Sequence, residues 1–241
     1  MKILIISDIH SNYTALKAVL SDAGEVDATW CLGDLVGYGP DPNECIQTVK
    51  SLPNLVCLLG NHDAAVIGRL DVSTFNREAG YVVNWTYQVL TPENREFLNS
   101  LPESQVVGDV SLFHGSPRNP IWEYLLDLRT VEQNFAVLQT PIGMVGHTHI
   151  PAIYTLNGQR KGQWHVPLEK DRVILVDKTI ANPGSVGQPR DHDPRASYVL
   201  YDSENRHWEL RRISYNVVEV ETRIIRAKLP TRHATRLFEG W

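Results

Sequence analysis

Short apolar runs alternate with stretches of helical period over the N-terminal part of the chain. The run Ile3–Ser7 is apolar up to its last residue, which is typical of a strand buried on both faces. Over Thr14–Ala23 the apolar residues recur at helical spacing, and the stretch closes at Gly24. The same order continues as strand, helix and strand over Ala28–Leu32, Pro42–Ser51 and Asn54–Leu59. Strands that alternate with helices at this spacing predict βαβ units and a parallel sheet.

The centre of the chain is mainly helical in pattern, with isolated strands. Residues Ala64–Leu101 have a helical pattern, and Thr91 followed by Pro92 is a typical helix start. Three further elements are expected, a strand over Val106–Phe113, a helix over Val131–Leu138 and a strand over Ile142–Val145.

After Pro151 the pattern changes to short strands without helices between them. These strands are expected over Ala152–Leu156, Gln163–Pro167, Arg172–Val176, Ala196–Tyr201 and Trp208–Ile213. Short strands in succession favour antiparallel, hairpin-linked pairing. An amphipathic helix over Val217–Leu229 is expected to close the fold. Because no repeat, low-complexity tract or linker interrupts the pattern, we predict a single α/β domain over residues 1–241.

Composition supports a folded enzyme-sized domain and excludes several classes of protein. Of the 241 residues, 42% are hydrophobic and 21% are charged, which is enough apolar material for a core. A disordered tail, a collagen-like chain and a disulfide-dependent miniprotein are therefore excluded. The net charge is −5 and no block of Lys or Arg occurs, so we expect no strong nucleic-acid surface and no binding to an anionic membrane.

The cysteines and the N-terminus indicate a cellular location. Cys31, Cys45 and Cys57 are odd in number and have apolar neighbours, which predicts buried thiols in a reducing compartment. The apolar run at the N-terminus is too short for a signal peptide or a membrane-spanning helix. We therefore expect a soluble, cytoplasmic protein.

Polar residues follow five of the predicted apolar strands. The five segments are Asp8-Ile9-His10, Gly33-Asp34, Gly60-Asn61-His62-Asp63, His114-Gly115 and Gly146-His147-Thr148-His149. Loops at the carboxyl ends of strands line the ligand crevice of an open α/β sheet, so these side chains are expected to meet. Residues two apart, such as Asp8 and His10, can point to the same side of an extended segment. The glycines allow sharp turns close to the site without Cβ clashes.

The residue types in these five segments predict a metal site. Two carboxylates, one carboxamide and several imidazoles form a mixed oxygen and nitrogen ligand set for divalent transition metals, and the set is too large for one ion. Two divalent ions and the carboxylates of Asp8 and Asp34 leave a charge of roughly +2, which suits a phosphate group and a hydroxide. Any one of the segments alone is more often a turn or an ordinary histidine. Their combination, each after a strand, favours a dinuclear site.

The segments D-x-H, GD, GNHD, HG and GHTH together resemble the signature of the calcineurin-like metallophosphoesterase superfamily, and most closely its small bacterial phosphodiesterase-like members. The resemblance extends from Ile3 to about His149. It implies a four-layer αββα sandwich with a dinuclear metal site at the carboxyl ends of the strands. It also implies two sets of metal ligands, one for each ion, which are Asp8, His10 and His149 and then Asn61, His114 and His147. By the same resemblance Asp34 bridges both ions, while the unligated His62 faces the substrate.

The resemblance further implies a reaction. Two divalent ions (Mn, Fe, Zn, Ni or Co, with manganese favoured) would activate a bridging hydroxide that attacks phosphorus, and His62 would protonate the leaving oxygen. The expected substrate is a small phosphodiester or phosphomonoester, such as a nucleotide. The helical segment Ala64–Leu101 would flank the active site, and its aromatic residues are either a platform for a base or ordinary core positions.

Two alternatives remain beside this hydrolase. In protein Ser/Thr phosphatases and symmetrical dinucleoside tetraphosphatases of the superfamily, an arginine follows the bridging aspartate, whereas this chain has Gly37 and Tyr38 there. The absence of that arginine counts against a protein phosphatase and favours diesters. A non-catalytic scaffold on the same fold should have lost site residues, but every expected ligand and His62 are present.

Several polar residues outside the ligand set are candidates for substrate binding. They are Asn12, Tyr38, Asn182 and Arg190, with Ser185 in the same loop as the last two. Asn182 and Ser185 could equally brace the metal ligands, and a turn with a solvated Arg190 explains this loop as well. The remaining histidines are interpreted as surface or packing residues, namely His165, His192, His207 and His233.

Overall fold

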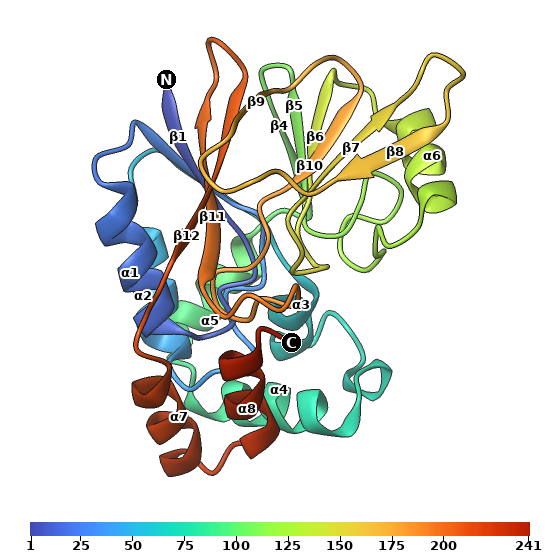
Figure 1. Cartoon of the computed structure of the whole chain (residues 1–241). Coiled ribbons are helices and arrows are strands. Elements are labelled where there is room, and N and C mark those ends of the chain that lie inside the picture. Colours follow the sequence, from blue (N-terminus) through green and yellow to red (C-terminus); the bar gives the residue numbers. More distant parts are fainter.

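The computed structural model describes residues 1–241 and contains two six-stranded sheets packed face to face (Figure 1). The first sheet has the order β3-β2-β1-β11-β12-β9. Its strands are β1 Lys2–Ile6, β2 Ala28–Cys31, β3 Leu55–Cys57, β9 Arg172–Ile174, β11 Ala196–Asp202 and β12 His207–Ile213. Strands β1, β2 and β3 are parallel, as the βαβ pattern predicts, and β11, β12 and β9 join them in antiparallel pairing.

The second sheet has the order β4-β5-β6-β10-β7-β8. Its strands are β4 Ser104–Val107, β5 Val110–Phe113, β6 Ile142–Met144, β7 Ala152–Leu156, β8 Gly162–His165 and β10 Thr179–Asn182. The three central strands β5, β6 and β10 are parallel, and the outer strands are antiparallel to their neighbours. Each sheet therefore has parallel strands whose carboxyl ends point to one edge of the molecule.

Helices cover the outer faces of both sheets and the edge at which the parallel strands end (Figure 1). They are α1 Tyr13–Ala23, α2 Pro42–Lys50, α3 Asn61–Val66, α4 Arg77–Val89, α5 Pro92–Ser100, α6 Leu128–Val137, α7 Val217–Arg226 and α8 Thr231–Glu239, with a short 3-10 helix at Val72–Thr74. Helices α1 and α2 lie on the first sheet and α6 on the second, which gives the predicted order of layers, helix, sheet, sheet, helix.

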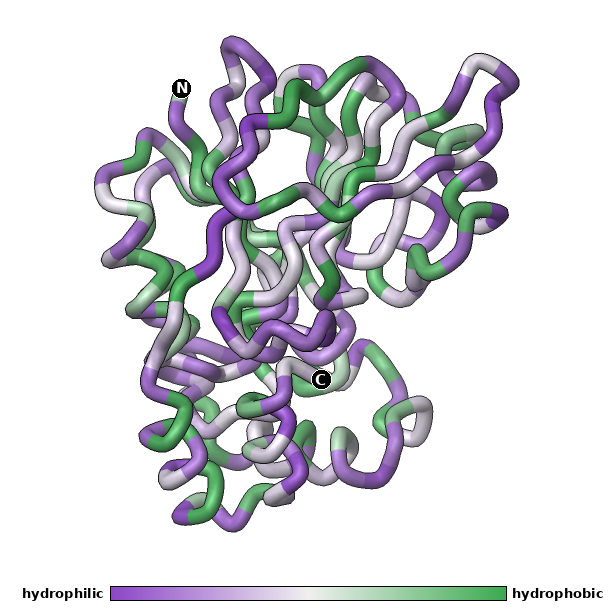
Figure 2. The backbone as a smooth tube through the Cα atoms, in the orientation of Figure 1, coloured by the Kyte–Doolittle hydropathy of each residue, from purple (hydrophilic) through white to green (hydrophobic).

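The alternation of side chains along β1 explains why the sheets stack. Ile3 and Ile5 belong to the core between the two sheets, whereas Leu4 and Ile6 belong to the core under α1 and α2. Successive residues of a strand point to opposite faces, so an uninterrupted apolar run is buried on both sides. In Figure 2 the strands carry long hydrophobic stretches, whereas the helices alternate between hydrophobic and hydrophilic segments. No helix here combines the length and the apolarity needed to span a lipid bilayer.

Three expectations about the elements are wrong, and one strand was missed. The strand expected over Val106–Phe113 is the hairpin β4–β5, because Gly108 adopts a left-handed φ of 60° and reverses the chain. The closing helix expected over Val217–Leu229 ends at Arg226, and α8 follows Pro230 as a separate helix. Strand β10 was not predicted, and it pairs in parallel with β6 instead of in a hairpin. The strand β9 pairs with β12 and not with a preceding hairpin partner.

Candidate metal centre

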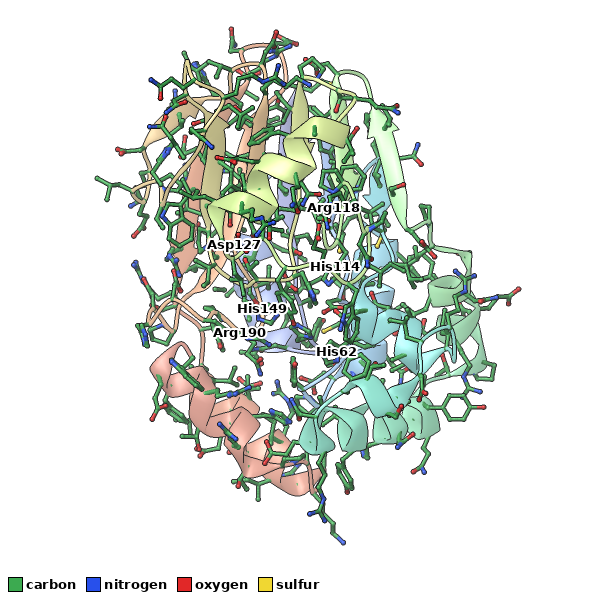
Figure 3. The ribbon with its side chains drawn as sticks, turned by 90° about the vertical axis from the view of Figure 1, so that its right-hand side faces the viewer. His62, His114, Arg118, Asp127, His149 and Arg190 are labelled. Carbon is green, nitrogen blue, oxygen red and sulfur yellow. The ribbon has the colours of Figure 1, made fainter.

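The loops that follow the parallel strands bring the seven predicted ligands to one buried place between the sheets and the helices at the strand ends. None of the seven is more than 3% exposed. They are Asp8, His10, Asp34, Asn61, His114, His147 and His149. Figure 3 shows His114 and His149 near the centre of the molecule, with His62 and Arg190 on the side of the helices.

One group of side chains lies around Asp8. Its Oδ1 atom is 3.4 Å from Nε2 of His149 and 3.8 Å from Nε2 of His10. The two Nε2 atoms of His10 and His149 are 3.1 Å apart. Donor atoms this close to one another can share one ion, as the grouping predicted for the first metal requires.

A second group lies around His114. Its Nε2 atom is 3.1 Å from Oδ1 of Asn61 and 3.1 Å from Nδ1 of His147. Asp34 stands between the groups, since its Oδ2 is 3.4 Å from Nε2 of His114 and 3.5 Å from Nε2 of His10. A single carboxylate oxygen is therefore within reach of both groups.

The histidine rings are held by backbone carbonyl groups on their far side. The four contacts are His10 Nδ1 to Val36 O at 3.0 Å, His114 Nδ1 to Leu32 O at 2.9 Å, His149 Nδ1 to Gln188 O at 2.6 Å and His147 Nε2 to Trp122 O at 3.2 Å. A carbonyl oxygen accepts the proton of that ring nitrogen, so the other nitrogen presents a lone pair to the centre. This arrangement is typical of histidines that bind metal ions.

The two carboxylates are oriented in the same way. Oδ2 of Asp8 accepts the backbone N–H of His147 at 3.1 Å, and Oδ1 of Asp34 accepts that of His62 at 2.9 Å. The other oxygen of each, Asp8 Oδ1 and Asp34 Oδ2, is buried without a hydrogen-bond partner. A buried carboxylate oxygen without a donor is costly, and a cation between the groups would stabilise both. The residues present therefore fit a pair of divalent ions.

Burial sets the charge state of the imidazoles. It lowers the pKa of His10, His147 and His149 well below the usual value, which leaves them in the neutral form that binds metal ions. Burial acts in the same direction on His114, but the carboxylates of Asp34, Asp8 and Asp63 together outweigh it and raise the pKa of His114 to about 9. Metal binding would release this proton.

The ligand loops have an unusual backbone. Asp8, His10, Asp34, His147 and His149 all have positive φ, between 48° and 65°. The prediction that Asp8 and His10 share a face of an extended segment is therefore wrong, because left-handed turns and not strand geometry direct them. Backbone hydrogen bonds between loops hold this conformation, with Asp8 N donating to Gly33 O and His10 N to Asp34 O, each at 3.0 Å.

Two of the predicted glycines are required by close approach. A Cβ atom on Gly60 would lie 2.1 Å from Oδ1 of Asp34, and one on Gly146 would lie 2.0 Å from Oγ of Ser7. No larger residue fits at either position without displacing the ligand loops.

Asp63 has a role that sequence reasoning missed. Its fully buried carboxylate accepts the backbone N–H groups of Gly60, Leu35 and Val36 at 3.0, 3.2 and 3.0 Å. Burial and the nearby charge of Asp34 raise the pKa of Asp63 to about 7, although the three donors favour the charged form. Asp63 thus joins the loop that carries Asp34 to the loop that carries Asn61. The last letter of the GNHD segment was the available signal.

Replacing Asp63 is expected to destabilise the fold and the site together. Asp63→Ala leaves three buried N–H groups without an acceptor, so the free energy of unfolding should fall by about 3 to 5 kcal/mol. Chemical denaturation measures this loss. The matched control is Asp71→Ala, which removes the exposed cap of the short 3-10 helix Val72–Thr74 and should cost far less stability. Equal losses for the two variants would contradict the role of Asp63.

His62 lies beside both groups. Its donor atoms are within 4.8 Å of those of His10 and Asp34, and its Nδ1 is buried without a hydrogen-bond partner. The ring packs against Tyr38 and Phe75, with ring centroids 4.5 and 5.0 Å apart. This position is compatible with contact to a substrate and is also within reach of an ion.

The candidates for substrate binding divide into two kinds. Asn12 caps α1 and donates to Gly187 O, while Asn182 donates to Gly146 O and to Thr148 Oγ1. Both amides are fully buried and brace loops, so the bracing alternative describes Asn182. Ser185 likewise donates to Asp8 O.

Tyr38 and Arg190 remain at the mouth of the site. Nη2 of Arg190 is 3.3 Å from the Tyr38 hydroxyl. The loop after Asp34 has no arginine of its own, but Arg190 brings a guanidinium to the residue that takes that place. The sequence argument against a protein phosphatase and in favour of diesters is weakened accordingly.

The aromatic residues near the site differ from those expected. Phe75 contacts His62, but Tyr81, Trp85 and Tyr87 lie elsewhere, where Tyr81 donates to Lys228 O, Trp85 packs against the α7–α8 core and Tyr87 stacks on Arg95. Tyr124 was not predicted, and its ring stacks on His147 with centroids 3.7 Å apart. His233 packs against Tyr38 in the interior, while His165 and His192 are exposed.

Comparison with known proteins identifies the family. Residues 1–206 match the family model of the calcineurin-like phosphoesterase superfamily domain. A metallophosphoesterase from Sphaerobacter thermophilus is 43% identical, with a TM-score of 0.90 over 100% of this chain and 99% of that one. An uncharacterized protein of Methanocaldococcus jannaschii is 38% identical over 99% of this chain and 98% of its own length.

A more local similarity involves a named enzyme. The symmetrical bis(5'-nucleosyl)-tetraphosphatase of Proteus mirabilis is 41% identical over 73 residues, which are 28% of this chain and 26% of that protein. The full-length matches and the family model confirm the resemblance predicted from the five segments, and the chain belongs to the calcineurin-like phosphoesterase superfamily.

Proposed function

We propose that this chain is a phosphoester hydrolase that depends on two divalent metal ions. The observation that carries the proposal is the pair of unpaired buried oxygens, Asp8 Oδ1 and Asp34 Oδ2, which face imidazole nitrogens fixed from behind by carbonyl groups. Asp8, His10 and His149 would hold one ion, Asn61, His114 and His147 the other, and Asp34 both. Manganese is proposed first, since three oxygen-donor side chains accompany the imidazoles.

Each group around the centre would have a separate task. The two ions, when bound, would polarise the phosphoryl oxygens and lower the pKa of a water molecule. His62 would give a proton to the leaving oxygen, and its ring is held in place by Tyr38 and Phe75. Arg190 would hold a phosphoryl oxygen at the mouth of the site. The substrate would be a small phosphodiester or phosphomonoester.

Hydrolysis of bis-p-nitrophenyl phosphate should require added metal. We expect the rate to fall to background after treatment with a chelator and dialysis, and to return when Mn²⁺ is added, because the nucleophile depends on the ions. Release of p-nitrophenolate measures the rate, and elemental analysis measures the bound metal. Full activity in a preparation free of metal would refute the proposal.

The same assay separates the alternatives. A scaffold would bind metal ions yet hydrolyse no phosphoester with any of Mn, Fe, Co, Ni or Zn. A protein phosphatase would turn over a phosphoserine peptide faster than bis-p-nitrophenyl phosphate. The retention of the complete ligand set together with His62 supports a hydrolase over a scaffold.

We also propose that the protein works in a reducing compartment such as the cytoplasm. Cys31, Cys45 and Cys57 are all free and buried. Cys31 and Cys57 are register partners on β2 and β3, and a reducing compartment would keep these two neighbouring thiols from oxidation.

A further inference from the structure

A cavity of about 410 Å³ lies at the mouth of the metal centre. The side chains that line it come from segments far apart in the chain, and they are Tyr38, Asn76, Tyr124, Arg190, Arg236 and Trp241. Arg236 belongs to α8, and Trp241 is the last residue of the chain. Figure 3 shows Arg190 between His149 and the C-terminal helices.

Two of the lining rings also contact proposed site residues, one from each group of metal ligands. The Tyr38 ring lies 4.6 Å from that of His10 and 4.5 Å from that of His62, centroid to centroid. On the other side Tyr124 stacks on His147 at 3.7 Å. The cavity therefore adjoins the metal centre through Tyr38 and Tyr124.

The cavity carries two arginines that have no ion-pair partner. Neither Arg190 nor Arg236 has a carboxylate within 4.0 Å, and none of the six lining residues is acidic. Arg190 donates to the Tyr38 hydroxyl and to Oε1 of Gln188, and Arg236 lies over the Trp241 ring. The Nε atoms of both arginines are buried without a partner.

Several other partly buried arginines pair with acids, as Arg212 does with Asp191 and Arg223 with Asp41. Arg190 and Arg236 line the same cavity without such a partner. Burial and then the charge of Arg190 lower the pKa of Arg236. Two guanidinium groups held together with unused donors form an anion site, because an anion would remove the repulsion and satisfy the donors.

We propose that this cavity binds a second phosphoryl group of the substrate, so that the enzyme prefers phosphoesters with a further anionic phosphoryl group next to the scissile one. The half-exposed faces of Tyr124 and Trp241 at its rim suit a planar ring, which points to nucleotides with two or more phosphoryl groups. This inference rests on the proposed hydrolase function and names its substrate class.

Competition between nucleotides tests the inference. ADP and AMP differ by one phosphoryl group, and each is measured as a competitive inhibitor of bis-p-nitrophenyl phosphate hydrolysis at fixed free Mn²⁺. We expect ADP to bind at least about 10-fold more tightly than AMP, since charge-assisted hydrogen bonds to one more phosphoryl group are gained. Equal inhibition by the two nucleotides would overturn the inference.

Substitutions of Arg236 test whether this residue causes the preference for ADP over AMP. Arg236→Ala should weaken the binding of ADP by about 10- to 100-fold and the binding of AMP by less than about threefold. Arg236→Lys should restore part of the lost ADP affinity. The matched control is Arg232→Ala, which removes an exposed arginine of the same helix that does not line the cavity and should change neither constant. If Arg232→Ala and Arg236→Ala lose ADP affinity equally, the inference is also overturned.

A melting temperature and a calorimetric titration distinguish failure of this inference from a structural role of Arg236 and from failure of the proposed hydrolase function. Because removal of Arg236 relieves repulsion, its alanine variant should melt at or above the temperature of the wild type, and a lower melting temperature would indicate a structural role instead. If no phosphoester is hydrolysed with any metal, the proposed function fails. Calorimetry of the metal-loaded protein with α,β-methylene-ADP and AMP then still decides whether the cavity binds a second phosphoryl group.

Discussion

The variant Asp34→Ala should lose both metal ions at once and at least about 10³-fold in rate on bis-p-nitrophenyl phosphate. The reason is geometric, since Oδ2 of Asp34 lies 3.5 Å from His10 Nε2 and 3.4 Å from His114 Nε2 and has no other partner. His10→Ala, by contrast, removes a member of one group only. Elemental analysis should find about two ions per chain in the wild type and about one in the His10 variant.

The control for this experiment is Asp171→Ala, which removes an exposed carboxylate that makes no ion pair. It should keep both ions and the full rate. The backbone N–H of His62 donates to Asp34 Oδ1, so Asp34→Asn preserves that contact and tests the charge alone. Two tightly bound ions per chain in Asp34→Ala would show that Asp34 does not bridge the metals.

His62→Ala should keep both ions and lose about 10²- to 10⁴-fold in rate, the range for a positioned general acid. The loss should depend on the leaving group, because an alkoxide of high pKa needs the proton far more than p-nitrophenolate does. Across a series of phosphodiesters, the rate of the variant should therefore fall more steeply with the pKa of the leaving alcohol than that of the wild type.

His165→Ala is the matched control, since His165 is an exposed imidazole on β8. It should have the wild-type slope and rate. His62 lies within reach of the same centre as His10 and Asp34, so its metal content must be measured in parallel. Loss of one ion would make His62 a ligand, and an equal loss of rate on every leaving group would make it a stabiliser of charge instead of an acid.

Much of the site could be predicted because its information is local. Each ligand follows directly after a strand, and the apolar runs identify the strands without knowledge of their partners. Ile3–Ser7 is an example, since its uninterrupted apolar pattern predicts burial between two layers, which Ile5 and Ile6 confirm on opposite faces. Parallel strands end at one edge, so the pattern also predicts that the ligands meet.

Other features depend on contacts that the chain order does not reveal. The run Val106–Phe113 divides into two strands because Gly108 turns there, and β10 is a strand because β6 and β7 flank it. Asn182 resembles a ligand-binding residue in sequence, yet its amide is used up by Gly146 and Thr148. A strand of four residues has too little periodicity to reveal its partners, and the amide at its end carries no local signal for the groups that it contacts.

The sequence by itself determined the family, the order of the main elements and the residues that gather at the strand ends, because each follows from a short pattern. Only the tertiary structure decided how those residues are aimed and what surrounds them. The left-handed backbone at Asp8 and Asp34 is held by hydrogen bonds between loops. Arg190 meets Tyr38 across 152 positions of the chain, and α8 brings Arg236 to the same cavity. Such contacts are fixed by the packing of distant segments, whose free energy no local pattern records.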